Sequence, residues 1–351
     1  MRVTGVEAAF NATTGAPVPD LATVPSQSAT KRHYFAQETS YRETWALIQD
    51  MAGRGANAAW SRHTYILFKP DAVVSHAVRK GLALLAECGF EALACAPLSI
   101  TRHQLRELWR FDMNKVPVER LAAADLLFSA GEALVVLLRD PTGSGASERL
   151  RDLKGHAKSA NRAPDQLRAR LGAGDFLLDF VHSPDEPADM VRELGLLLTR
   201  RQLAHFVSVM TGAASAEPAE VVAMAGAMEG QVGHHPLDLS ASLGRFAAAF
   251  GDRPRPEIAR PTPAPLQAGA ADWQEVLDAL LQARTPSPLP QLERIHGLPE
   301  RILALAAGDP RRRLWPDQDL ELWDTVVIAA KLSQRDLGGV KSLLEEPLAV
   351  A

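Results

Sequence analysis

The sequence predicts an α+β protein in which helices pack on one face of a mostly antiparallel sheet. Three observations support this fold class. Short runs rich in β-branched and aromatic residues recur between residues 63 and 182, segments with helical spacing separate them, and no strand is evident after residue 200. The predicted order is strand, helix, strand, helices, strand, helix, loop, strand and helix.

Four segments are expected to be strands because they are short, apolar and bounded by turn residues or charges. The first, HTYILFKPD, stops at Pro70, which lacks a backbone donor. The second alternates in character, and the third, EALVVLLRD, is a continuous apolar run typical of a buried strand. The fourth, DFLLDFVH, ends on a histidine. The four expected strands cover residues 63–71, 90–100, 132–140 and 175–182.

The segments around these strands carry helix signals. Ser40 with Glu43, and Thr101 with Gln104, have the spacing of capping boxes. Glycines close several of the segments, as they commonly do at helix ends. The expected helices before residue 200 cover residues 40–55, 75–89, 101–111, 117–129, 146–155 and 184–198, with a turn at 164–172.

The pattern divides the chain into three regions. Residues 1–61 are an N-terminal extension with one helix, of which residues 1–38 read as loosely ordered. Residues 62–200 hold the strands and form the predicted central domain. Residues 201–351 read as helical, interrupted at about 252–270 by a proline-rich linker, RPRPEIARPTPAPLQAGA.

Composition excludes several classes of protein. A net charge of -4 over 351 residues gives no sign of a general nucleic-acid binder. No apolar run reaches the roughly 20 residues that span a bilayer, and the first residues lack the apolar core of a secretory signal. Cys88 and Cys95 lie in apolar segments and are expected to be reduced. We therefore expect a cytoplasmic protein without membrane partners.

The stretch DFVHSPDEP contains the main candidate for chemistry, His182. A lone histidine after an apolar stretch is more often structural. A histidine that accepts a phosphoryl group needs one exposed ring nitrogen, an acceptor that holds the other, and cations for the phosphate. Glu193 could be that acceptor, and the candidate cations are Lys69, Arg151 and Arg168. Lys69, Arg151 and Glu193 also have a plainer interpretation as surface charges. Arg170 competes with Arg168 for the same role, and the spacing favours Arg168.

Four motifs together resemble the nucleoside diphosphate kinases. They are YILFKPDAV, SAGEALVVLLRD, LKG followed by LRA, and DFVHSPD followed by RELGLLL, in this order and spacing. The similarity covers about residues 62–200 and looks closest to divergent members with Leu-Arg-Ala before the histidine. It implies a ferredoxin-like α/β sandwich.

The resemblance also implies roles for individual residues. His182 matches the histidine that is transiently phosphorylated, Lys69 the lysine beside the transferred phosphate, and Glu193 the glutamate that orients the histidine. Further matches concern the nucleotide. Arg151 and Arg168 correspond to the two phosphate-binding arginines, Asp185 to a supporting acid, and Phe111 to a tyrosine near the phosphate site.

The chain departs from the family pattern at four positions around the site. Ala157 replaces a phosphate-binding threonine, and Asp179 replaces an asparagine that contacts sugar and phosphate. Ser183 and Pro184 replace the glycine and serine after the catalytic histidine. We count Asp179 among the nucleotide-binding residues and Ser183 among the supporting ones. Phe176 and Leu121 are the candidates for the base site.

The resemblance implies a phosphotransferase that moves the γ-phosphoryl group of a nucleoside triphosphate, with Mg²⁺, through phospho-His182 to a nucleoside diphosphate or a related acceptor. The expected ligands are nucleotides such as ATP, and no protein metal site is expected. A homo-oligomer, with a dimer favoured, is also implied. The alternative is a catalytically silent nucleotide-binding or scaffold protein on the same fold. An acceptor that is not a nucleotide remains a third possibility.

Overall fold

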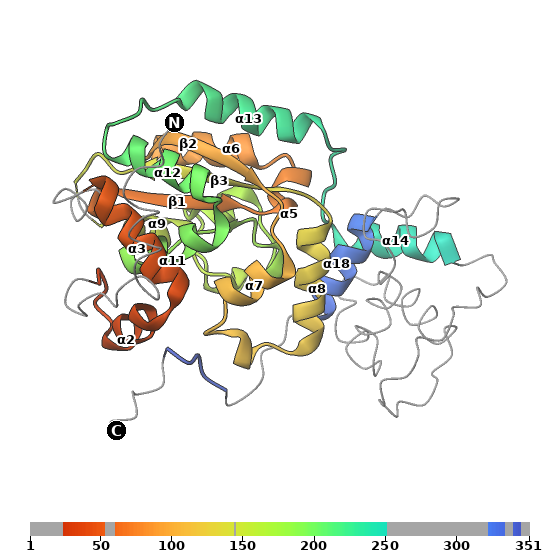
Figure 1. Ribbon diagram of the computed structural model, residues 1–351. Coiled ribbons are helices and arrows are strands. Elements are labelled where there is room, and N and C mark those ends of the chain that lie inside the picture. The colour runs from red at the N-terminus through yellow and green to blue at the C-terminus, as the bar shows by residue number, and fades with distance from the viewer. Residues whose placement is uncertain (1–23, 53–59, 144, 251–321, 334–339, 345–351) are drawn as a thin grey trace.

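A four-stranded antiparallel sheet lies at the centre of the protein, in the order β2-β3-β1-β4 (Figure 1). The structure is a computed structural model that describes residues 24–52, 60–143, 145–250, 322–333 and 340–344. This sheet confirms the predicted fold class. The strands are β1 (His63–Phe68), β2 (Glu91–Leu98), β3 (Ala133–Arg139) and β4 (Val181–His182).

Helices cover both faces of the sheet, so the expectation of one covered face was wrong. Every residue of β1 is buried, as a strand between two helical layers requires. Successive side chains of a strand point to opposite faces. Tyr65 and Leu67 accordingly enter one apolar core, whereas Ile66 and Phe68 enter another.

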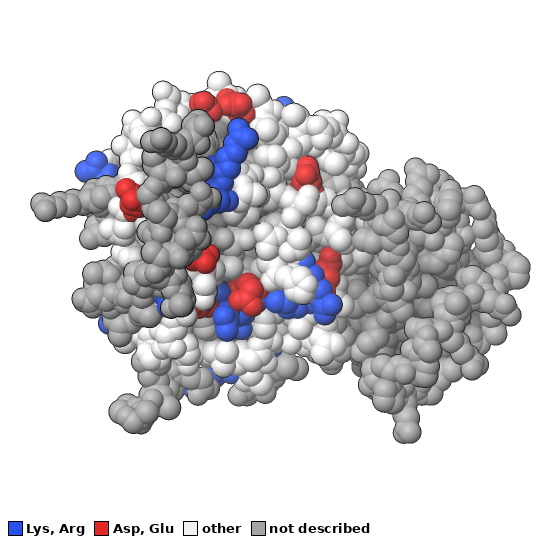
Figure 2. All heavy atoms as spheres, in the orientation of Figure 1, with Lys and Arg blue, Asp and Glu red and all other residues white. Residues whose placement is uncertain are grey.

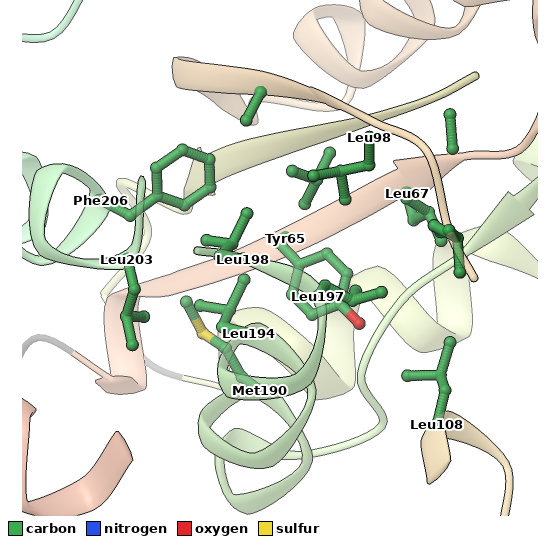
Figure 3. Packing of buried hydrophobic residues seen from close by; sticks show 14 of the residues in the cluster. Tyr65, Leu67, Leu98, Leu108, Met190, Leu194, Leu197, Leu198, Leu203 and Phe206 are labelled. Carbon is green, nitrogen blue, oxygen red and sulfur yellow. The ribbon is translucent and has the colours of Figure 1, made fainter. Parts of the chain in front are cut away.

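The first core packs the sheet against helices from the N-terminal extension and from the central region. Figure 3 shows Tyr65 beside side chains of the helix that follows β4, among them Met190, Leu194 and Leu197. The helices of this layer are α2 (Ala29–Gln37), α3 (Thr39–Ala52), α7 (Arg102–Leu108), α8 (Val118–Ser129), α11 (Pro187–Leu197) and α12 (Arg200–Met210).

The second core lies on the opposite face. Val221, Ala225 and Met228 of α13 pack there, and Glu217 N donates to Leu93 O of edge strand β2 at 2.8 Å. Figure 1 shows α13 running along the β2 side of the sheet. The helices of this layer are α5 (Pro70–Val74), α6 (Val78–Glu87), α9 (Ala146–Lys154), α10 (Leu167–Leu171) and α13 (Pro218–Gly230).

Within residues 24–52, the N-terminal extension contains one helix more than predicted. Residues 29–37, read as loosely ordered, form α2, and Phe35 is buried in the first core. Lys31 Nζ lies 2.7 Å from Asp189 and 3.1 Å from Glu186, both at the start of α11. α2 has almost no amphipathic pattern, so these tertiary contacts, invisible to local sequence analysis, hold it. The helix predicted at residues 40–55 begins at Thr39, and Ser40 therefore lies inside it.

The C-terminal region is helical where the structure describes it. α14 (Leu239–Phe250) packs against α18 (Leu322–Leu332). Asp324 is buried between His235 Nε2 at 3.1 Å and Arg245 Nη2 at 2.6 Å. Burial opposes the charge of Asp324, but hydrogen bonds from His235 and Arg245 lower its pKa to about 2. The predicted linker at 252–270 lies outside the described residues, and the division into three domains stays a prediction.

Two surface properties bear on partners. Figure 2 shows acidic and basic side chains interspersed on the face in view, with no broad basic field. Every helix in the described ranges is too short or too polar to cross a membrane.

The last strand is much shorter than the eight residues predicted. Residues Phe176–Leu178 form a 3-10 helix, η5, and only Val181 and His182 pair with β1. Phe176 and Phe180 both have positive φ, at 48° and 66°, which breaks an extended run. Phe180 N donates instead to the buried Asp71 Oδ2 at 3.0 Å.

Gly195 of α11 lies against Thr44 of α3, and a substitution there tests this close approach. An added Cβ would overlap Thr44 Oγ1 and lie 3.0 Å from Thr44 Cβ. Gly195→Ala should therefore lower the free energy of unfolding by roughly 1–3 kcal/mol, measured by urea titration. Gly226→Ala in α13 is the matched control, because its Cβ meets nothing closer than Arg79 Cδ at 3.7 Å. Equal stability of the two variants would contradict the packing described.

Asp71 should make stability depend on pH. Burial raises its pKa to about 6, with a further contribution from Asp179 that Lys69 opposes. The folded protein thus holds this proton more tightly, and stability should increase as pH falls from about 6 towards 4, by up to about 3 kcal/mol. Asp71→Asn should flatten this slope, as followed by urea unfolding at pH 7 and pH 5. An unchanged slope would argue against the assignment to Asp71.

Candidate functional site

A cavity of about 480 Å³ opens at the end of the sheet where β1 and β4 meet. Four predicted site residues lie on its wall, namely Lys69, Arg168, Asp179 and His182. The remaining wall comes from the segment after α7, from α8, from residues 156–158, from η5 and from β4. Its other residues are Trp109, Asp112, Met113, Lys115, Val116, Arg120, Leu121, Ala124, Phe128, His156, Ala157, Lys158, Phe176, Leu177 and Val181.

Strand pairing brings Lys69 and His182 to the same place. In the register of β1 with β4, His182 lies opposite Leu67, and Lys69 N donates to Phe180 O at 2.8 Å. Lys69 directly precedes α5, whose first residue is Pro70, a favoured position for proline. The strand therefore ends and the helix begins at the point where the lysine side chain enters the cavity.

His182 is held through one ring nitrogen. Its Nε2 lies 3.0 Å from Glu193 Oε2, and Tyr65 OH donates to the same carboxylate oxygen. Among the described residues, Nδ1 has no hydrogen-bond partner. Because the carboxylate accepts at Nε2, it favours the tautomer in which Nδ1 carries the lone pair. This geometry suits a nitrogen that acts as a nucleophile.

Glu193 remains ionised although it is buried. Burial raises its pKa, but His182, Tyr65 and Arg192 together hold it below the usual value. Burial raises the pKa of Tyr65 well above its usual value, and the negative charge of Glu193 raises it further. The tyrosine therefore stays a donor. It shares Glu193 Oε2 with the histidine and helps to hold the carboxylate in place.

Lys69, Arg168 and Asp179 form a buried ionic cluster on the cavity wall. Lys69 Nζ lies 2.6 Å from Asp179 Oδ1, and Arg168 Nη2 lies 2.5 Å from Asp179 Oδ2. All three residues are at most 6% exposed. The structure thus brings together the predicted lysine, one predicted arginine and the aspartate that departs from the family pattern.

Two predicted phosphate-site residues lie elsewhere. Arg151 is exposed and pairs with Asp152 at 2.9 Å, away from the cavity wall. Phe111 is buried in the first core, 5.7 Å from the ring of Phe35, with Arg192 over its face at 5.1 Å. The sequence-based placement of Phe111 near the phosphate site was wrong, because its apolar ring packs with α2.

The two supporting candidates, Ser183 and Asp185, follow the histidine in the sequence but do not line the cavity. Asp185 is exposed. Ser183 is buried, and its Oγ has no hydrogen-bond partner. Ala157 does line the cavity, as a departure that removes a hydroxyl there.

Trp109 is a site residue that the sequence analysis missed. Its ring lies 5.5 Å from that of His182 in an edge-on arrangement, and it lines the cavity two positions before Phe111. Both residues are aromatic and near the end of α7, so the spacing alone did not separate them. Of the two aromatic residues, Trp109 is the one that contacts His182 of β4.

Lys154 is a second missed residue. It is buried and donates to Ser183 O at 3.2 Å, directly after His182. Burial lowers its pKa to about 8, and the positive charge of Arg168 acts in the same direction. It belongs to the Leu-Lys-Gly segment of the sequence motif, so that segment could have indicated it.

The candidates for the base site both line the cavity. Leu121 comes from α8, and Phe176 belongs to η5. The guanidinium of Arg120 lies 4.4 Å from the centre of the Phe176 ring, and Lys158 Nζ lies 5.2 Å from it. Contacts of this kind are attractive and hold the ring in place.

Residues of the C-terminal region form hydrogen bonds with residues 111–120, a segment that supplies part of the cavity wall and that we call the outer wall. Arg120 Nε donates to Ser333 O at 2.9 Å, and Asn114 Nδ2 donates to Lys341 O at 2.5 Å. Ser342 Oγ also donates to Phe111 O at 3.0 Å. Phe111, Asn114 and Arg120 all belong to the segment from the end of α7 to α8, which supplies part of the cavity wall and is bonded here to the C-terminal region.

Part of the chain matches a known protein family. Residues 62–203 match the family model of nucleoside diphosphate kinase. Among solved structures, the chain is similar to the nucleoside diphosphate kinase of Aquifex aeolicus, with 23% identity over 40% of this chain and 96% of that one and a TM-score of 0.34.

Two further solved proteins are similar. The nucleoside diphosphate kinase of Encephalitozoon cuniculi shares 18% identity over 38% of this chain and 87% of that one, with a TM-score of 0.34. An NDP kinase from Pyrobaculum aerophilum shares 16% over 41% and 98%, with the same TM-score of 0.34. The family match and the sequence motifs together identify residues 62–203 as a nucleoside diphosphate kinase-like domain with a nucleotide-binding fold.

Proposed function

We propose that this protein is a phosphotransferase that works through phospho-His182. The observation that supports it most directly is the contact of His182 Nε2 with Glu193 at 3.0 Å, which leaves Nδ1 as the nucleophile. In the first half-reaction, the lone pair of Nδ1 attacks the γ-phosphorus of a nucleoside triphosphate. The bond from that phosphorus to the bridging oxygen breaks, and the diphosphate leaves with the electron pair.

In the second half-reaction, an oxygen of a nucleoside diphosphate or a related acceptor attacks the phosphorus. The phosphorus–nitrogen bond then breaks, and its electron pair returns to Nδ1. Throughout, Glu193 accepts a hydrogen bond from the Nε2–H group and stabilises the positive charge that the ring acquires. Lys69 and Arg168 line the cavity together with His182 and would supply positive charge to the phosphate groups.

Mg²⁺ would neutralise phosphate charge during the transfer. Among the described residues, no group of three or more potential ligands could hold a metal on its own. Both carboxylate oxygens of Asp179 already face cations. We therefore propose that the ion arrives on the phosphate oxygens of a nucleotide such as ATP. A homo-oligomer, with a dimer favoured, and a cytoplasmic location belong to the same proposal.

A second candidate function is nucleotide binding, or scaffolding, without turnover. The observation in its favour is that the cations expected to meet phosphate are already paired with Asp179. The loss of the hydroxyl at Ala157 points the same way. A coupled assay that showed brisk conversion of nucleoside diphosphates to triphosphates would exclude this candidate.

Incubation with γ-³²P-labelled ATP and Mg²⁺ tests the transfer. Wild-type protein should become labelled in an acid-labile, alkali-stable form, as phosphohistidine is. His182→Asn should take no label, and Glu193→Gln should slow labelling by roughly 100-fold, because the ring loses its partner and its orientation. His205→Asn is the matched control, since this histidine is exposed on α12. Equal labelling of His182→Asn, or none of the wild type, would exclude the proposed mechanism.

A further inference from the structure

The carboxylate of Asp179 lies between the two cations that line the inner cavity. Its two oxygens are divided between them, with Oδ1 at 2.6 Å from Lys69 Nζ and Oδ2 at 2.5 Å from Arg168 Nη2. Asp179 is 5% exposed, yet it belongs to the cavity wall. A carboxylate with two such contacts occupies the position relative to these cations that a phosphate group would take.

Arg168 has little capacity left for a ligand. Its Nε donates to Asp179 O at 3.2 Å, Nη1 to Gly155 O at 2.7 Å and Nη2 to Val181 O at 2.5 Å. Lys69 Nζ similarly donates to Leu177 O at 2.7 Å. The hydrogen bonds that a phosphate would need are therefore made within the chain.

The charge of Asp179 is also retained. Burial alone would raise the pKa of Asp179, but Arg168 and Lys69, followed by Lys154, hold it below the usual value. An ionised carboxylate thus neutralises part of the positive charge at this end of the cavity. A polyphosphate that approached would meet a like charge unless the carboxylate moved away.

We propose that Asp179 is an internal competitor of the ligand's phosphate groups, which holds Lys69 and Arg168 until a nucleotide displaces it. This inference rests on the proposed function for the identity of the ligand. It makes Asp179 a specificity-determining residue. Ligands whose phosphate charge is offset by Mg²⁺ meet less repulsion from it than metal-free nucleotides do.

Calorimetric titration of the full chain with the non-hydrolysable β,γ-imido analogue of ATP and Mg²⁺ tests this competition. Asp179→Asn should bind the analogue at least about tenfold more tightly than wild type, because no carboxylate then neutralises the charges of Lys69 and Arg168 or repels the phosphates. Asp165→Asn removes the same charge from an exposed position in the loop before α10 and should stay within about twofold of wild type.

A second titration in EDTA addresses the metal. Wild-type protein should lose more affinity on removal of Mg²⁺ than Asp179→Asn does, since the variant lacks the repelling carboxylate. Binding by Asp179→Asn that is no tighter than that of wild type would overturn the inference. An equal loss of affinity in EDTA would overturn its metal-dependent part.

Folding has to be followed alongside, because Asp179→Asn removes the carboxylate closest to the buried Lys69. Thermal melts should show a lower midpoint for Asp179→Asn without ligand and a larger rise when the analogue is added. Asp179→Ser should behave in the same way and serves if the asparagine variant does not fold. A smaller rise than in wild type for both variants would also overturn the inference.

The outcomes separate this inference from the proposed function. Tighter binding by Asp179→Asn without any label on His182 would leave the competition standing and exclude the transfer. Labelling of His182 without tighter binding would do the reverse. Failure of wild type and both Asp179 variants to bind the analogue would exclude the two together.

Discussion

The pairing of two residues of β4 with the end of β1 is the constraint on which the site depends. It sets His182 opposite Leu67, and the adjoining bond from Lys69 N to Phe180 O keeps the lysine beside it. This short pairing therefore places Lys69 and His182 together on the cavity wall. α11 starts a few residues later and delivers Glu193 to the buried side of the histidine ring. A longer β4 would place these residues farther from the turn that aims the lysine.

Two buried carboxylates contact residues of the cavity wall, and each has partners of its own, which explains how an apolar setting tolerates their charge. Glu193 meets His182 and Tyr65, and Asp179 meets two cations. Under the proposed function, the first arrangement prepares Nδ1 of His182 for attack. The second neutralises positive charge that phosphate groups would otherwise meet.

The sequence predicted the parts of the fold whose signals are local. β1, β3 and the capping box at Thr101 follow from apolar runs and side-chain spacing, and each is confirmed. The shortness of β4 could not be predicted, because it depends on positive φ at Phe180 and on a distant carboxylate. The same holds for Trp109, since only tertiary packing distinguishes it from a neighbouring aromatic residue.

The docking of the C-terminal segment also has a consequence for the order of events during synthesis. Ser342 reaches Phe111 across 231 positions of the chain. Contacts of such long range form late, both because loop closure is costly and because the later partner leaves the ribosome last. The sheet and His182 can therefore assemble while the outer wall of the cavity is still unsupported. The segment from Phe111 to Arg120 would lack these bonds until residues 333–342 have left the ribosome.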